Sequence, residues 1–190
     1  MMVKTGLYFG SFNPIHNGHL MIANYLTAFS DLDELWFVVS PHNPLKPASE
    51  LLNEKDRLLL CQEAIQGHPK LRVCDVEFSM PRPSYTIDTL SLLTKKYPDH
   101  IFTFICGMDS LAQIHRWKEY HKILDGYRIF VYPRKGYHQT LTHPNVYPID
   151  APEVEVSSTF IRQAVREGRD IRYFVHPAVW DAIKENDYYR

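Results

Sequence analysis

Short apolar segments alternate with longer amphipathic segments along the chain. The short ones have the length and the β-branched and aromatic content of strands. They span residues 3–9, 35–39, 71–76, 101–106 and 127–132, and residues 146–149 are expected to add an edge strand. Several of these segments are apolar at every position, which is typical of strands that are covered on both faces of a sheet.

The longer segments repeat apolar residues at helical spacing. They span about 18–29, 54–67, 87–97, 108–125, 158–167 and 177–186, and the fourth is expected to be broken. Asn53 and Pro177 suit helix starts, and Gly168 suits a helix end. The alternation predicts an α/β fold, in which an open, mainly parallel, Rossmann-like sheet is flanked by helices within a single domain of residues 1–190. Ligands of such folds bind beyond the carboxyl ends of the strands.

Composition narrows the possible partners. The 190 residues are 45% hydrophobic, and 21 Lys and Arg face 22 Asp and Glu, so the formal charge is −1. This balance argues against a nucleic-acid partner or an anionic lipid surface, and no apolar run approaches the ~20 residues of a membrane-spanning helix. Three cysteines without C-x-x-C spacing argue against a disulfide framework and a structural zinc site, so we expect a cytoplasmic protein. The oligomeric state is left open.

The segment GSFNPIHNGH, residues 10–19, joins the first strand to an apolar helix. It contains neither the P-loop pattern nor G-x-G-x-x-G, which argues against a P-loop NTPase and a conventional NAD-dependent dehydrogenase. His16 and His19 are three residues apart, so both rings fall on one side of a helix start, and Gly18 leaves room for a ligand. Helix N–H groups and two imidazoles that donate hydrogen bonds or carry charge suit a triphosphate. The alternative is a loop with two surface histidines; zinc is favoured less, because H-E-x-x-H is absent.

A second segment, VSSTFIR at residues 156–162, places hydroxyl groups at another helix start. Arg162 lies one turn inside that helix, so the segment could form a second anion site. Taken alone, a Ser-Ser-Thr run is more often an ordinary helix cap.

The two segments together resemble the nucleotidyltransferase superfamily. GSFNPIHNGH resembles its H/T-x-G-H signature, in the form found in the nicotinate-nucleotide adenylyltransferases of bacterial NAD synthesis, with Asn13 where Asp is common. VSSTFIR resembles the distal I-S-S-T-x-I-R motif, with Val156 in place of Ile. Each motif is weak alone, but both occur here in the family's order at opposite ends of one chain.

The resemblance implies roles for specific residues. It implies catalytic roles for His16, His19, Lys46 and Arg162, and ATP contacts for Gly10, Ser11, Phe12, Gly18, Gly107, Asp109, Arg134, Ser157, Ser158 and Thr159. For several of these residues the local sequence also permits an ordinary structural role. Lys46 could be a solvated charge, Asp109 a helix cap and Arg134 an exposed loop arginine.

The segments SYTIDTL and GMDSLAQIHRW are implied to bind the second substrate. By match to the family, Tyr85 and Thr86 lie against the carboxylate of nicotinate mononucleotide, and Trp117 stacks on its pyridine ring. On local grounds, Thr86 is instead interpreted as an N-cap, with Asp88 in the first turn of that helix. Trp117 is then interpreted as a core residue. A helix start also suits a carboxylate better than a neutral amide, because the amide NH₂ group cannot accept hydrogen bonds.

The implied reaction is attack by the 5′-phosphate of nicotinate mononucleotide on the α-phosphorus of ATP, which gives deamido-NAD and pyrophosphate. Mg²⁺ is expected to arrive with ATP rather than in a dedicated protein site. Three alternatives stay open: a related adenylyl- or cytidylyltransferase with another phosphate acceptor, a non-catalytic nucleotide-binding sensor, and a zinc hydrolase. SYTIDTL and Trp117 favour nicotinate mononucleotide among the acceptors.

Overall fold

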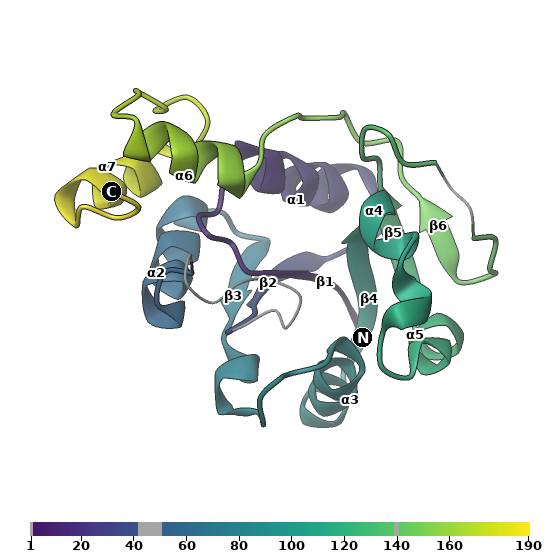
Figure 1. Cartoon of the computed structure of the whole chain (residues 1–190). Coiled ribbons are helices and arrows are strands. Elements are labelled where there is room, and N and C mark those ends of the chain that lie inside the picture. Colours follow the sequence, from purple (N-terminus) through teal and green to yellow (C-terminus); the bar gives the residue numbers. More distant parts are fainter. Residues whose placement is uncertain (1, 42–50, 139–140) are drawn as a thin grey trace.

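The computed structural model describes residues 2–41, 51–138 and 141–190 and contains a six-stranded parallel sheet. The strands are β1 (Val3–Gly10), β2 (Glu34–Val39), β3 (Leu71–Cys74), β4 (His100–Gly107), β5 (Arg128–Tyr132) and β6 (Val146–Pro148). Their order is β3-β2-β1-β4-β5-β6, and each neighbouring pair is parallel (Figure 1). The predicted open Rossmann-like sheet is confirmed, including its short edge strand.

Helices connect the strands. They are α1 (Asn17–Phe29), α2 (Glu54–Ile65), α3 (Thr86–Lys96), α4 (Met108–Leu111), α5 (Tyr120–Gly126), α6 (Ser158–Arg166) and α7 (Pro177–Glu185), with the 3₁₀ helices η2 (Val76–Ser79) and η3 (Ile114–Arg116). The expected break in the fourth helical segment is real, since α4, η3 and α5 replace it. The third strand ends at Cys74, sooner than predicted, because the chain turns into η2.

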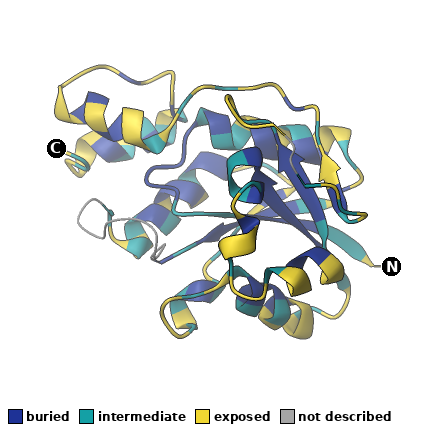
Figure 2. Cartoon of the chain, turned by 45° about the vertical axis from the view of Figure 1, so that its right-hand side comes forward, coloured by how far each residue is buried: buried dark blue, intermediate teal, exposed yellow. Residues whose placement is uncertain are grey.

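Successive strand residues feed opposite layers of the core. On one face, Tyr8, Phe37 and Ile105 pack with α1, α2, α6 and α7. On the other face, Leu7, Val38 and Phe104 pack with α3, α4 and α5. The sheet is therefore the buried middle layer, and the outer sides of the helices are exposed (Figure 2). This double cover explains why several of the strands are almost entirely apolar.

Most of the predicted helix ends are confirmed. The side chain of Asn53 accepts a hydrogen bond of 2.9 Å from the Lys55 N–H, and Pro177 is the first residue of α7. Gly168 follows α6 with a φ of +68°, a left-handed conformation that favours glycine. The prediction of Thr86 as an N-cap is wrong: Tyr85 is the N-cap of α3, and its side chain makes no capping hydrogen bond.

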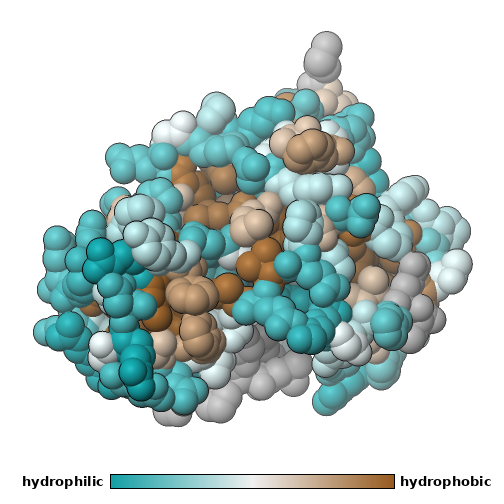
Figure 3. Space-filling view, turned by 90° about the horizontal axis from the view of Figure 1, so that it is seen from above, coloured by the Kyte–Doolittle hydropathy of each residue, from teal (hydrophilic) through white to brown (hydrophobic). Residues whose placement is uncertain are grey.

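The carboxyl-terminal region packs onto the start of α1. The backbone N–H of Asn17 donates to the Phe174 carbonyl at 2.9 Å, and the Asn17 side chain donates to the Tyr173 carbonyl at 2.8 Å. Tyr173 itself is 87% exposed. On the face of the molecule seen in Figure 3, apolar side chains lie in the middle and mostly hydrophilic side chains surround them. In the described part of the chain, no helix combines the length and apolar character needed to cross a bilayer.

A buried arginine connects the loops at the carboxyl ends of β1 and β2. Arg57 of α2 is 0% exposed, and its guanidinium donates to the carbonyls of Ser11 and Ser40 at 2.5 and 2.8 Å. It also donates to the carbonyls of Pro41 and Leu52, both at 2.8 Å. The planar fork of arginine suits several acceptors at once, and burial lowers the pKa of this group from its ordinary value. One side chain thus holds three loop segments together.

Replacing Arg57 is expected to destabilise the fold strongly. Arg57→Met keeps similar bulk but leaves four carbonyls without their donor, so we expect the free energy of unfolding to fall by about 3 kcal/mol or more. Urea denaturation measures this loss. Arg172→Met is the control, because Arg172 forms an exposed ion pair with Asp170 at 2.6 Å and should change stability by about 1 kcal/mol or less. Equal effects of the two substitutions would contradict the role of Arg57.

Candidate active site

Two adjoining cavities open at the carboxyl ends of the central strands. The larger cavity, of about 540 Å³, lies beyond β1, β4 and β5 and reaches the start of α6. The smaller cavity, of about 280 Å³, lies between the end of β1, the start of α3 and η3. Both are lined by Phe9, Gly10, Ser11 and Ser110. A molecule in one cavity therefore lies next to a molecule in the other.

The larger cavity brings together most of the residues predicted to bind ATP or to act in catalysis. Its lining includes Gly10, Ser11, Phe12, His16, His19, Asp109, Arg134, Ser157, Ser158, Thr159 and Arg162. Gly18 and Gly107 are buried behind this lining. Lys46 lies outside the described residues. Segments more than a hundred residues apart in sequence thus meet at one edge of the sheet, as the fold class predicts.

The two histidines form a stacked pair at the start of α1. Their ring centroids are 3.7 Å apart with an interplanar angle of 21°, and the His16 backbone N–H donates to His19 Nδ1 at 3.3 Å. A Cβ atom on residue 18 would lie 3.1 Å from the His16 ring. Gly18 therefore leaves room for the neighbouring imidazole.

His16 is electrically neutral at physiological pH. The side chain is 3% exposed, and burial, together with the nearby Arg134, lowers the pKa of His16 to about 3. Burial therefore disfavours the charged form of His16, one of the two forms that the sequence left open. Its Nδ1 atom is buried and has no hydrogen-bond partner among the described residues. In its neutral form His16 can act on a ligand through hydrogen bonds.

Asp109 and Arg134 face each other across the larger cavity. Asp109 Oδ1 lies 3.8 Å from Arg134 Nε, and both atoms are buried without a hydrogen bond among the described residues. Gly107 makes this position possible, because a Cβ there would lie 2.3 Å from Asp109 Oδ1. Asp109 is in the first turn of α4, and Gly107 is the N-cap. The pair places opposite charges side by side in the wall of the larger cavity.

Two tyrosines that line the larger cavity, Tyr8 and Tyr132, were not identified as site residues from the sequence. Tyr132 accepts a hydrogen bond of 3.3 Å from the Arg134 guanidinium, and its side chain also forms a hydrogen bond with Tyr8. Tyr8 packs edge-on against His19, with centroids 5.9 Å apart. Burial raises the pKa of Tyr8 well above its ordinary value. Both residues lie in apolar strands, where a tyrosine is read as core, so no sequence signal distinguished them.

The start of α6 is bonded to the loop after β1. Ser158 Oγ donates to the Pro14 carbonyl at 2.9 Å, and Arg162 donates to the Asn13 carbonyl at 3.0 Å. The Ser157 hydroxyl caps the helix by accepting from the Phe160 N–H at 3.2 Å. Ser158 and Arg162 are thus partly engaged in holding the loop, which the motif alone did not reveal. Thr159 is exposed toward the cavity opening.

Asn13 also supports the loop. Its side-chain oxygen accepts a hydrogen bond of 3.1 Å from the Leu52 N–H, and the residue is buried. A carboxylate oxygen would accept the same bond. The Asn at this position, which departs from the family pattern, is therefore compatible with the same loop structure.

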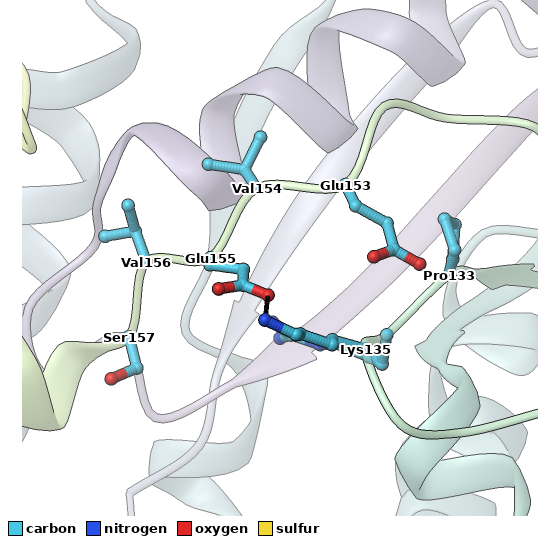
Figure 4. Close-up of a pocket in the computed structure, with 8 residues that line it drawn as sticks. Pro133, Lys135, Glu153, Val154, Glu155, Val156 and Ser157 are labelled. Carbon is cyan, nitrogen blue, oxygen red and sulfur yellow. Dashed lines mark ion pairs between the residues drawn. The ribbon is translucent and has the colours of Figure 1, made fainter.

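A third, shallower cavity of about 330 Å³ adjoins the larger one. It lies between the turn after β5 and residues 153–157, and it shares Arg134, Val156 and Ser157 with the larger cavity. Lys135 extends across it to Glu155, where the two charges are 2.6 Å apart (Figure 4). Both side chains are mostly exposed, so this ion pair contributes little to stability. The larger cavity therefore continues outward along the segment that leads into α6.

The smaller cavity contains all three residues predicted to bind the second substrate. Tyr85, Thr86 and Trp117 line it, and Trp117 is half-buried, with its ring 5.8 Å from that of Phe104. The Lys118 ammonium lies 4.9 Å from the Tyr85 ring centroid and pairs with Asp88 at 2.8 Å. Because no side chain caps α3, its first N–H groups can bind an anion in this cavity. The sequence did not single out Glu77 and Arg116, which also line it.

Comparisons with known proteins identify the relatives of this chain. The cytidylyltransferase-like family model matches residues 7–164. The chain is 46% identical to a "probable nicotinate-nucleotide adenylyltransferase" of Flavobacterium johnsoniae, over 99% of this chain and 100% of the relative. It is 51% identical to a protein of the same name from Bacteroides fragilis, over 95% and 90% of the two chains.

A solved structure shows the same fold. The nicotinic acid mononucleotide adenylyltransferase of Plasmodium falciparum, complexed with NaAD, superposes with a TM-score of 0.83. The superposition covers 98% of this chain and 97% of that chain, at 21% sequence identity. The arrangement of sheet and helices is thus shared at low sequence identity.

The low pKa of His16 predicts how stability depends on pH. An unfolded chain protonates this histidine near pH 6.5, whereas the folded chain does so near pH 3. The stabilising contribution is therefore complete above pH 6.5 and is lost as the pH falls toward 3, by about 1.4 kcal/mol per pH unit. His16→Asn should remove this slope, measured as the difference in unfolding free energy between the two proteins at pH 7 and pH 5.

NMR provides an independent measurement. The ring ¹⁵N shifts of His16 should show a neutral imidazole at pH 5. A titration midpoint near 6.5 would contradict the buried, neutral state.

Proposed function

Because the chain belongs to the cytidylyltransferase-like family, and within it to the nicotinate-nucleotide adenylyltransferases, we propose that it transfers the adenylyl group of ATP to nicotinate mononucleotide. The products are deamido-NAD and pyrophosphate, so the enzyme acts in NAD biosynthesis. The observation that supports this best is the pair of adjoining cavities, which share Gly10 and Ser11 at the end of β1. A two-substrate transfer needs such neighbouring sites.

ATP occupies the larger cavity in this proposal. The starts of α1 and α6 both line it, and the positive ends of the two helix dipoles attract the triphosphate. Arg134 and Arg162 add positive charge at the same wall, and the Asp109 carboxylate can accept hydrogen bonds from ribose hydroxyls. Mg²⁺ enters with ATP, because this ion is commonly held by substrate phosphates. Lys46 is proposed to close over the phosphates.

Nicotinate mononucleotide occupies the smaller cavity. Its carboxylate is proposed to accept hydrogen bonds from the first N–H groups of α3, next to Tyr85 and Thr86, and its ring to stack on Trp117. Its phosphate then points toward the shared residues and toward the α-phosphorus of ATP. The amide of nicotinamide mononucleotide fits this helix start less well, because it carries no negative charge.

The chemistry needs positioning more than acid–base catalysis. The attacking phosphate oxygen is already anionic at neutral pH, so no side chain has to deprotonate the nucleophile. An oxygen of this phosphate forms a bond to the α-phosphorus as the bond to the bridging oxygen of pyrophosphate breaks. His16, which is neutral, and its stacked neighbour His19 are proposed to stabilise the developing charge by hydrogen bonds.

Pyrophosphate release tests the reaction directly. With ATP and Mg²⁺, we expect rapid release with nicotinate mononucleotide and much slower release with nicotinamide mononucleotide, measured in parallel by a coupled phosphate assay. Equal rates would contradict the proposed carboxylate recognition. No release with either acceptor, from protein that binds ATP, would contradict the acceptor assignment and favour another acceptor or a sensor role.

His19→Ala is expected to lower kcat by about 100-fold or more while the KM for nicotinate mononucleotide changes little. The lost hydrogen bond acts mainly in the transition state, where charge develops on the phosphates. Steady-state kinetics with each substrate varied in turn measures both constants. The control is His121→Ala, because His121 is exposed on α5, outside both cavities. An unchanged kcat in the His19 variant would exclude it from catalysis.

A further inference from the structure

The buried carboxylate of Glu77 has no role in the proposed reaction. Glu77 lies in η2, lines the smaller cavity and is 2% exposed, which makes it the one buried acidic side chain among the described residues. Burying a carboxylate costs free energy unless hydrogen bonds replace water. The Glu77 carboxylate therefore needs hydrogen-bond donors from the protein.

Hydroxyl groups supply those partners. Ser84 Oγ donates to Glu77 Oε2 at 2.8 Å, and Thr89 Oγ1 donates to Glu77 Oε1 at 2.9 Å. A third hydrogen bond comes from the side chain of Ser40, just after β2. Burial raises the pKa of Glu77, whereas these three hydrogen bonds lower it. The carboxylate joins three segments around the cavity: the end of β2, the turn before α3, and α3 itself.

The hydrogen bonds from Ser84 and Thr89 have a particular relation to α3. Tyr85 is the N-cap, so Ser84 directly precedes the cap and Thr89 is the fourth helical residue. In many helices an apolar contact between these same two positions fixes the angle at which the chain enters the helix. Here the Glu77 carboxylate bridges them with hydrogen bonds instead.

This bridge leaves the start of α3 open to a ligand. A capping side chain would bind the first N–H groups and compete with an anion for them, but Tyr85 makes no such bond. Glu77 holds the helix start through side-chain hydroxyls and takes none of those N–H groups. The helix entry is thus rigid, although its first N–H donors remain available.

We propose that Glu77 is a positioning residue for the second substrate: by bridging Ser84 and Thr89, it aims the first N–H groups of α3 at the substrate carboxylate. The inference rests on the proposed function and names a residue outside the recognition motifs. Glu77 does not touch the substrate carboxylate; it acts through the orientation of the helix start.

Glu77→Gln tests the proposal. The glutamine NH₂ group cannot accept a hydrogen bond, so at least one hydroxyl loses its acceptor and the helix entry loosens. We expect the KM for nicotinate mononucleotide to rise about tenfold, which is the effect of one charge-assisted hydrogen bond, while the KM for ATP stays within about twofold. The preference for the acid over the amide substrate should fall, because the amide depends less on the N–H groups.

Two further sets of variants make the test specific. Glu54→Gln is the matched control. Glu54 forms an ion pair of 2.7 Å with Arg82, which lies in the turn before α3, but Glu54 lines neither cavity. It should leave the acid-over-amide ratio unchanged. Ser84→Ala and Thr89→Val each remove one hydroxyl and should lower the ratio. Combined with Glu77→Gln, their effects should be less than additive, because all three variants break the same bridge.

Different results overturn different conclusions. A wild-type enzyme that makes no pyrophosphate with nicotinate mononucleotide would overturn the proposed function and this inference together. An active wild type, with an unchanged acid-over-amide ratio in Glu77→Gln, would overturn this inference alone. If Glu77→Gln does not fold, the ratios of Ser84→Ala and Thr89→Val decide: lowered ratios support the bridge and unchanged ratios overturn it. A purely structural role would lower the Tm and leave the ratio unchanged.

Discussion

The loop after β1, residues 11–14, is held from two sides by arginine side chains that donate to its carbonyls. Arg57 binds the Ser11 carbonyl from the side of α2, and Arg162 binds the Asn13 carbonyl from the side of α6. Loop carbonyls have no partners in a sheet or helix, so a buried loop needs donors from side chains. With its backbone satisfied in this way, the loop can form the floor shared by both cavities.

Around the smaller cavity, too, a buried charged side chain binds neutral groups of the protein, but there the charged group is a carboxylate and not a guanidinium. There the anion Glu77 binds hydroxyl donors, whereas Arg57 binds carbonyl acceptors. Ser40 joins the two systems, because its carbonyl accepts from Arg57 and its side chain donates to Glu77. In both places buried charged groups are bonded to neutral partners of the protein. At the start of α3, where the N-cap side chain makes no hydrogen bond, the first N–H groups remain available to a ligand.

Much of the fold could be predicted, because its signals are local. Apolar strands, amphipathic helices and caps such as Asn53 depend on neighbours within a few residues, and the structure places them as expected. The start of α3 differs, since Thr86 has a good capping side chain but the helix includes it. Glu77 lies seven residues before Ser84 and takes over the role of securing that helix start. No pattern within SYTIDTL could show this.

The sequence by itself determined the sheet, the family resemblance and the residues that meet at the site, because each depends on residue type and spacing. Only the tertiary structure decided how those residues act. It made His16 neutral through burial beside Arg134, gave Ser158 and Arg162 a part in holding the loop, and added Tyr8, Tyr132, Arg57 and Glu77 to the supports of the site. The physical reason is that protonation and hydrogen bonding depend on desolvation and on partners far away in the sequence.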